Sequence, residues 1–145
     1  MTHKFAICLY QPDMPQNLGV IIRTAACLEF PIHIVKPLPF SMSDKRFKGA
    51  VMDYIDHCKI LNHENWDNFY SYCEKNNKRV ILATTKTNNN LYDFEFKEND
   101  IVLFGKETAG VPDVRCTACP RKNTRTHTPA PVSYTHLTLP TKRIV

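Results

Sequence analysis

The chain has 145 residues, 43% of them hydrophobic, which is the size of one domain with a substantial core. Its 19 lysines and arginines exceed its 14 aspartates and glutamates, and the formal net charge is +5 at pH 7. Such a charge suits a polyanionic partner without requiring one, because a modest basic excess is often only a solvated surface.

The first apolar segment, residues 5–10, is a continuous run (FAICLY) that predicts a buried parallel strand. Gln11-Pro12-Asp13 ends the run too early for a signal peptide or a membrane span, so we expect a cytoplasmic protein. The loop then leads to Asn17, whose side chain is suited to cap a following helix. This helix is expected to bury Leu18, Ile21, Ile22, Ala25 and Ala26.

Two residues of this helix stand out, Gly19 and Arg23. Glycine costs about 1 kcal/mol relative to alanine in a helix, so we expect another group to approach the backbone closely at Gly19. Arg23 follows four residues later. On spacing alone, it is interpreted as a surface arginine that pairs with a carboxylate.

Residues 31–35 predict a second strand and complete a βαβ unit, whose loops open at the carboxyl ends of the strands, where ligands usually bind. His33 lies within this strand, so we interpret it as a packed residue and not as a base or a metal ligand. Residues 43–48 resemble a short capped helix that carries Lys45 and Arg46. These cations either contact phosphate groups or form a solvated helix face.

Asp53-Tyr54 and residues 57–61 suggest a third short strand. Residues 65–75 predict a helix that carries Trp66, Phe69, Tyr70 and Cys73 on one side. We expect these aromatic side chains to belong to the core and not to a platform for stacking bases.

Two more strands are predicted at residues 79–85 and 100–104. The second leads into residues 105–112, GKETAGVP, a tight turn whose backbone amides can face a ligand. Its two glycines are too close together for a phosphate-binding loop, and no Gly-x-Gly-x-x-Gly opens a helix after the first strand. Nucleoside triphosphatases and dinucleotide-binding enzymes are therefore disfavoured.

Four of the six cysteines lie singly within apolar or helical segments, which is typical of reduced thiols. They are Cys8, Cys27, Cys58 and Cys73. Cys116 and Cys119 have the spacing of half a zinc site, but the histidines that could complete it, His127 and His136, are far apart. We therefore expect no bound metal.

Residues 9–23 contain Pro15-Gln16-Asn17-Leu18-Gly19-Val20-Ile21-Ile22-Arg23, and residues 104–112 follow as a second motif. Shorter matching segments are Asp44-Lys45-Arg46, Asp53-Tyr54 and Ala83-Thr84-Thr85-Lys86. In this order, from about Lys4 to Pro112, the chain resembles the SpoU-type RNA 2′-O-methyltransferases. Within them it is most similar to the small tRNA wobble-position (cytidine/uridine) 2′-O-methyltransferases, the TrmL subfamily.

The resemblance implies an α/β fold of the SPOUT (α/β knot) type, with a parallel sheet flanked by helices and a C-terminal trefoil knot. It also implies S-adenosyl-L-methionine (AdoMet) as methyl donor, tRNA as substrate, and a homodimer whose interface builds the active sites. The site residues that it implies are Asn17, Arg23 and Glu107 for catalysis, and Ala83, Gly105 and Gly110 for the methyl donor. The basic residues Lys45 and Arg46 are the expected contact with RNA.

The chemistry agrees with these residue types, because a ribose hydroxyl is a poor nucleophile and needs activation and a donor held in line. In the family, the arginine at the position of Arg23 is thought to act as a general base or through a phosphate. A free arginine has a pKa above about 12, which makes it a poor base. Electrostatic activation is the alternative role.

The pattern changes abruptly near Asp113. The family continues with a strand, a third motif and an amphipathic helix that complete the knot, and residues 114–145 lack this pattern. Residues 114–129 are polar, basic and without a periodic apolar face, which is typical of disorder. Residues 132–141, VSYTHLTLPT, resemble the translation of a transposon-type sequencing adapter. We therefore expect an incomplete methyltransferase domain at 1–113, with the knot-forming segment missing, and an aberrant, disordered tail at 114–145 that follows a frameshift.

Two functional hypotheses result. The first is AdoMet-dependent methylation of a ribose 2′-hydroxyl of tRNA at the wobble nucleotide, by a family of which this chain is expected to be an inactive fragment. The second is a non-catalytic RNA-binding α/β module that uses the basic segment around Lys45 and Arg46.

Overall fold

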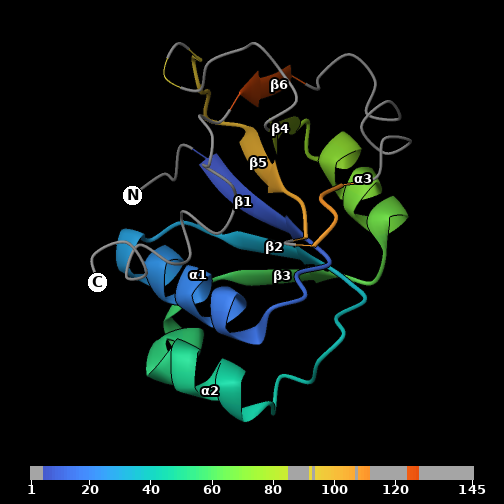
Figure 1. The fold of residues 1–145 in the computed structure, drawn as a ribbon. Helices are drawn as coiled ribbons and strands as arrows, with labels where there is room; N and C mark the ends of the chain where they lie inside the picture. Colours follow the sequence, from blue (N-terminus) through green and yellow to red (C-terminus); the bar gives the residue numbers. More distant parts are fainter. Residues whose placement is uncertain (1–4, 85–91, 93, 107, 112–123, 128–145) are drawn as a thin grey trace.

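The computed structural model describes residues 5–84, 92, 94–106, 108–111 and 124–127. The elements in chain order are β1 (Phe5–Tyr10), α1 (Pro15–Leu28), β2 (Ile32–Val35), α2 (Lys45–Val51), the 3-10 helix η1 (Met52–His57), β3 (Ile60–His63), α3 (Trp66–Lys75), β4 (Arg79–Thr84), β5 (Asp100–Phe104) and β6 (Thr124–His127). The strands form one parallel sheet in the order β3-β2-β1-β5-β4-β6 (Figure 1). The predicted α/β class with a parallel sheet is thus confirmed.

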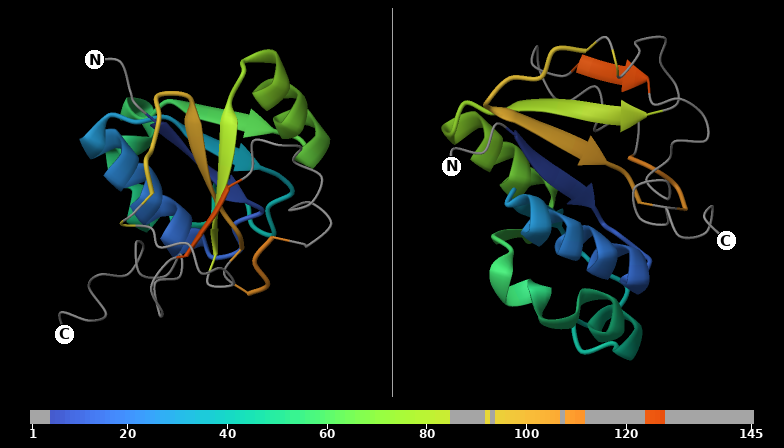
Figure 2. Two further views of the ribbon diagram at one scale, coloured as in Figure 1. Left: turned by 90° about the horizontal axis from the view of Figure 1, so that it is seen from above. Right: turned by 90° about the vertical axis from the view of Figure 1, so that its left-hand side faces the viewer.

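Helices cover both faces of the sheet, as Figure 2 shows. Helix α3 packs on one face, and α1 packs on the other, with α2 outside α1. Side chains alternate between these layers: Cys8 and Tyr10 of β1 join the cluster around α3, and Leu9 joins the cluster around α1. Strand β1 is therefore buried on both faces, which its continuous apolar run predicted.

The third predicted strand is displaced. Residues 52–57 form η1, and the strand occupies Ile60–His63. A parallel strand needs apolar residues on both faces, and the polar residues Asp53, Asp56 and His57 do not supply them. The helix at 65–75 is confirmed with Trp66 and Phe69 in the core, and its cap is Asn65, which accepts a hydrogen bond from the N–H of Asn68 at 2.9 Å.

The start of α1 differs from the prediction. Asn17 does not cap the helix, which begins at Pro15 after an extended Met14. Proline is favoured at the first helical position because its fixed φ suits a helix and its missing N–H is not needed there. Asn17 consequently lies in the first turn, where it is fully buried.

The close approach expected at Gly19 is confirmed, and the approaching group is helix α2. A Cβ atom at Gly19 would lie 2.6 Å from Cβ of Ala50 and 2.8 Å from the backbone nitrogen of Val51. Glycine therefore allows α1 and α2 to pack closely.

The four cysteines expected to be reduced, Cys8, Cys27, Cys58 and Cys73, are all free thiols, as predicted. No helix among the described residues is long and apolar enough to cross a bilayer.

The tail expected at 114–145 is described only at Thr124–His127. These residues form β6, which pairs in parallel with β4, with Thr126 opposite Ala83. The disorder expected for residues 114–145 stays a prediction, because the rest of this segment lies outside the described residues. Strand β6 is the outermost strand of the sheet, beside β4, and edge strands often carry polar and charged side chains.

His33 is a packed strand residue, as predicted, and it is paired with His63 of β3. Nδ1 of His33 lies 2.9 Å from Nε2 of His63, and both rings contact Phe69 and Tyr72. Burial, aided by the charges of His63, Lys78 and Lys59, lowers the pKa of His33 from 6.5 to about 4. Burial also lowers the pKa of His63.

This pair predicts a loss of stability in acid. The unfolded chain protonates His33 near pH 6.5, and the folded chain resists protonation down to about pH 4, so protons favour unfolding in this window. The free energy of unfolding in urea should fall by about 2 kcal/mol between pH 7.5 and pH 5. His33→Gln should flatten this dependence and His57→Gln, at an exposed histidine, should not; equal slopes in both variants would contradict the assignment.

Candidate functional site

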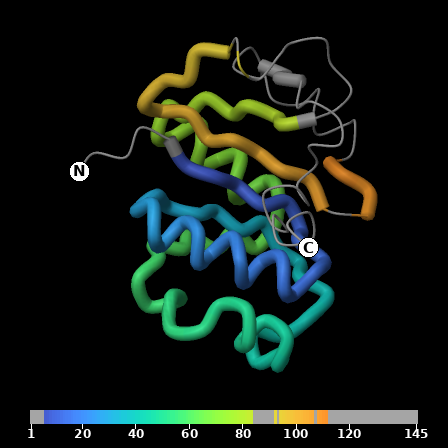
Figure 3. The backbone as a smooth tube through the Cα atoms, turned by 60° about the vertical axis from the view of Figure 1, so that its left-hand side comes forward, coloured from blue at the N-terminus to red at the C-terminus, as the bar shows by residue number. Residues whose placement is uncertain are grey.

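The candidate site lies at the carboxyl edge of the sheet, where β1, β5 and β4 end side by side (Figure 3). Leu82 of β4 is opposite Leu103 of β5, so Ala83 and Gly105 lie at the ends of neighbouring strands. The structure therefore brings together Ala83, Gly105 and Gly110, the three residues expected to contact a methyl donor. Their role in binding stays a prediction.

The segment after β5 is a tight turn, as predicted. The N–H of Gly110 donates to the carbonyl of Lys106 at 2.8 Å, and Gly110 has a left-handed φ of 68°. A Cβ atom at Gly105 would lie 2.4 Å from Cα of Gly110, so glycine is needed for the turn to close. We call residues 105, 106 and 108–110 the glycine turn.

The glycine turn is bonded to the loop that follows β1. Nζ of Lys106 donates to Oε1 of Gln11 at 3.2 Å, and the hydroxyl of Thr108 donates to the carboxylate of Asp13 at 2.5 Å. The sequence motifs contain all four residues, but no role could be assigned to them. The sequence feature that could have indicated these contacts is the position of each pair just after a strand, because β1 and β5 are neighbours in the sheet.

Gln11 itself has a left-handed φ of 43°, which is uncommon for a residue with a side chain. Its N–H donates to the carbonyl of Val35 at 2.9 Å, and its side chain accepts the bond from Lys106. Such backbone strain costs about 1 to 3 kcal/mol and persists where the surroundings hold the residue. Two hydrogen bonds thus hold Gln11 at the start of the loop that follows β1.

Of the residues expected to be catalytic, Glu107 lies outside the described residues. Asn17 is buried in the first turn of α1, where its Nδ2 donates to Sδ of Met14 at 3.4 Å. Its position supports the loop between β1 and α1. A catalytic role for either residue stays a prediction.

Arg23 is half-buried between α1, α2 and η1. Its Nη1 donates to the carbonyl of Ala50 at 3.5 Å, and its guanidinium carbon lies 5.5 Å from the ring centroid of Tyr54. The last carbonyls of a helix have no partner within the helix, and an arginine there is favourable. Among the described residues no carboxylate lies within 4.0 Å of Arg23, so they supply no partner for the expected ion pair, which stays a prediction.

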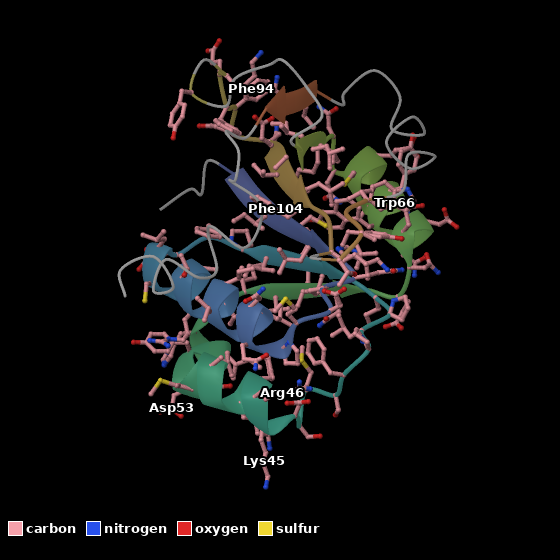
Figure 4. All side chains as sticks on the ribbon, viewed as in Figure 1. Lys45, Arg46, Asp53, Trp66, Phe94 and Phe104 are labelled. Atoms are coloured by element: carbon pink, nitrogen blue, oxygen red, sulfur yellow. The ribbon has the colours of Figure 1, made fainter. Side chains whose placement is uncertain are left out.

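The expected RNA contacts, Lys45 and Arg46, lie at the start of α2, in the outer layer of the molecule (Figure 4). Asp44 caps this helix by accepting a bond from the N–H of Arg46, and its carboxylate also accepts bonds from Nε and Nη2 of Arg46 at 3.2 and 2.9 Å. Pairing with Arg46 lowers the pKa of Asp44. Lys45 is exposed, whereas Arg46 is engaged by its own helix cap.

The residues at the carboxyl edge fit a small ligand such as AdoMet. A Cβ atom at Gly110 would meet no heavy atom of the described part of the chain within 4 Å, so the described residues leave the backbone at Gly110 open to approach. Backbone N–H and C=O groups at such turns recognise the polar edges of a ligand. Ala83, Gly105 and Gly110 are the described residues expected to hold AdoMet, and this assignment stays a prediction.

Comparison with known proteins agrees with this geometry. The sequence profile of the SpoU rRNA methylase family matches residues 4–128. A tRNA (cytidine(34)-2′-O)-methyltransferase from Ancylobacter novellus is 42% identical over 108 residues, which are 74% of this chain and 68% of that protein. Its counterpart from Beijerinckia indica is 39% identical over 107 residues, 74% of this chain and 67% of that protein.

A solved structure described as giving insights into 2-OH methylation of C/U34 on tRNA superposes with a TM-score of 0.81 at 30% identity, covering 99% of this chain and 95% of the other. The family profile extends past residue 113, the boundary expected from the sequence, and includes β6. The family match, the two relatives and this fold agree with one another. The chain belongs to the SpoU methylase family.

Proposed function

We propose that this protein transfers a methyl group from AdoMet to the ribose 2′-hydroxyl of the wobble nucleotide, position 34, of tRNA. The observation that carries the proposal is 42% identity over 108 residues to a tRNA (cytidine(34)-2′-O)-methyltransferase. The site supports it, because the glycine turn offers open backbone at the carboxyl edge. With tRNA as substrate, the protein would act in the cytoplasm.

In this proposal, separate residues of the chain bind the methyl donor and stabilise the reacting oxygen. AdoMet, when bound, supplies the methyl group. The backbone of the glycine turn, with Ala83, would hold it at the carboxyl edge. Arg23 would stabilise the negative charge that develops on the 2′-oxygen, or hold a neighbouring phosphate, because a guanidinium stays protonated at neutral pH.

A homodimer forms part of the proposal. Arg23 is the ninth residue of α1, so it lies about 12 Å along the helix from Pro15 and the carboxyl edge. Its side chain is directed to Ala50 and Tyr54, on the α2 side of the helix. A symmetric pair of chains could bring Arg23 of one copy to the glycine turn of the other.

The test is AdoMet binding at equilibrium, followed by methyl transfer to tRNA with a radiolabelled donor and nuclease mapping of the product. Arg23→Lys should lower the rate of methyl transfer by about 100-fold, because it keeps the charge and loses the planar fork of donors. The control Thr24→Ala, at an exposed neighbour on α1, should retain the rate within about twofold.

Two results would contradict the proposal: no AdoMet binding by the wild-type chain, or a methyl group on a base instead of a ribose. The first would agree with the expected inactive fragment. Binding of tRNA without AdoMet, lost in Lys45→Ala, would instead support the RNA-binding module.

A further inference from the structure

We propose that Asp13 and Thr108, together with Gln11 and Lys106, form a latch that positions the glycine turn for the methyl donor. These four would be positioning residues, since they act through the turn. The part that concerns AdoMet rests on the proposed function. The latch itself is a property of the protein without a ligand.

The contacts that carry this inference join two segments 95 positions apart in the sequence. Each strand end contributes two polar side chains, and each pair forms a hydrogen bond: Lys106 with Gln11 and Thr108 with Asp13. In the second bond the donor is a hydroxyl and the acceptor is a carboxyl oxygen of Asp13.

The placement of the two bonds favours positioning over general stability. The carbonyl of Lys106 accepts the bond from the N–H of Gly110 that closes the turn, and its Nζ donates to Gln11 in the loop after β1. Lys106 therefore connects the closing bond of the turn to that loop. Thr108 is an exposed residue of the glycine turn. Among the described residues, the other connections of the turn to the sheet are β5, which precedes it, and Val111, which packs against the core cluster around α3.

The strained backbone of Gln11 points the same way. Gln11 adopts a left-handed φ of 43°, a conformation that glycine would adopt more readily. The side chain that causes this cost is the one that accepts the bond from Lys106. The Gln11 side chain therefore serves a contact that glycine could not make.

The first test needs no cofactor. Hydrogen exchange of the Gly110 amide, followed by NMR, reports opening of the turn because this N–H closes it. Thr108→Val should raise the exchange rate about tenfold, and Thr108→Ser should restore the wild-type rate. Thr24→Val, which removes another exposed hydroxyl bonded to a backbone carbonyl, should leave Gly110 unchanged.

A double-mutant cycle tests the pairing itself. Asp13→Ala should raise the Gly110 exchange rate as Thr108→Val does, and the double variant should exchange no faster than either single variant. Additive effects, or an unchanged rate in Thr108→Val, would overturn the latch.

The second test separates positioning from stability. Gln11→Gly relieves the backbone strain, so its melting temperature should equal or exceed that of the wild type while Gly110 exchange becomes faster. In the same variant and in Thr108→Val, the AdoMet dissociation constant and KM should rise about tenfold, with kcat at saturating AdoMet within twofold.

A fall in kcat with an unchanged KM would overturn the positioning role. If the wild type bound no AdoMet, the proposed function would fail, and the exchange measurements would still decide the latch.

Discussion

Replacing Gly105 with alanine is expected to lower the free energy of unfolding by about 2 to 3 kcal/mol and to abolish measurable AdoMet binding. The added Cβ would lie 2.4 Å from Cα and from the carbonyl carbon of Gly110, and 2.6 Å from the nitrogen of Val111. These are backbone atoms, which cannot rotate away as a side chain can. The turn must therefore open, and the bond between Lys106 and Gly110 is lost with it.

Urea unfolding and equilibrium AdoMet binding measure the two effects. The matched control is Gly49→Ala, because Gly49 lies within α2 and a Cβ there meets no heavy atom within 4 Å. This control should gain up to about 1 kcal/mol from improved helix propensity and bind AdoMet as the wild type does. A Gly105→Ala variant with wild-type stability would show that the turn tolerates a side chain and would refute its proposed geometry.

Replacing Asp100 with alanine is expected to cost about 3 kcal/mol of stability, because it leaves a charged partner without its counterion. Asp100 is fully buried, and its carboxylate accepts two bonds from Arg79 at 2.6 Å and one from the N–H of Lys97 at 2.6 Å. Arg79 also donates to the carbonyl of Glu95 and lies over the ring of Phe94. One carboxylate thus joins β4, β5 and the segment that precedes β5.

Thermal unfolding followed by circular dichroism checks this effect. The control is Glu64→Gln, which removes the exposed pair of Lys36 and Glu64 at 3.5 Å. Its cost should stay within about 0.5 kcal/mol, because exposed ion pairs contribute little. If Asp100→Ala and Glu64→Gln lowered the stability by the same small amount, the pair of Arg79 and Asp100 would not be an important source of stability.

Strands β1 and β5 were predictable because each is a continuous apolar run with clear ends. Residues 5–10 end at Gln11-Pro12, and residues 100–104 end at Gly105, so both predicted ranges coincide with β1 and β5. Residues 53–61 mix polar and apolar residues without a period, and there the predicted strand was wrong in position. The local sequence pattern predicts the position of a strand only where the apolar run is continuous.

The site was predictable in part. The spacing of Asn17, Gly19 and Arg23 and the pair of glycines in residues 105–112 identified the family and two segments of the site. The environment of Arg23 was not predictable, because its partners belong to α2 and η1, 27 or more positions away. Nor was the partner of Gly19, since helix packing joins residues with no regular spacing between them.

The sequence by itself determined the α/β class, the two motifs and the need for glycine at a tight turn, because these depend on residue type and short-range spacing. Only the tertiary structure decided that β1 and β5 are neighbours. That adjacency places Gln11 against Lys106 and Asp13 against Thr108. Contacts between side chains 95 positions apart follow from strand order and register, which the sheet sets as a whole.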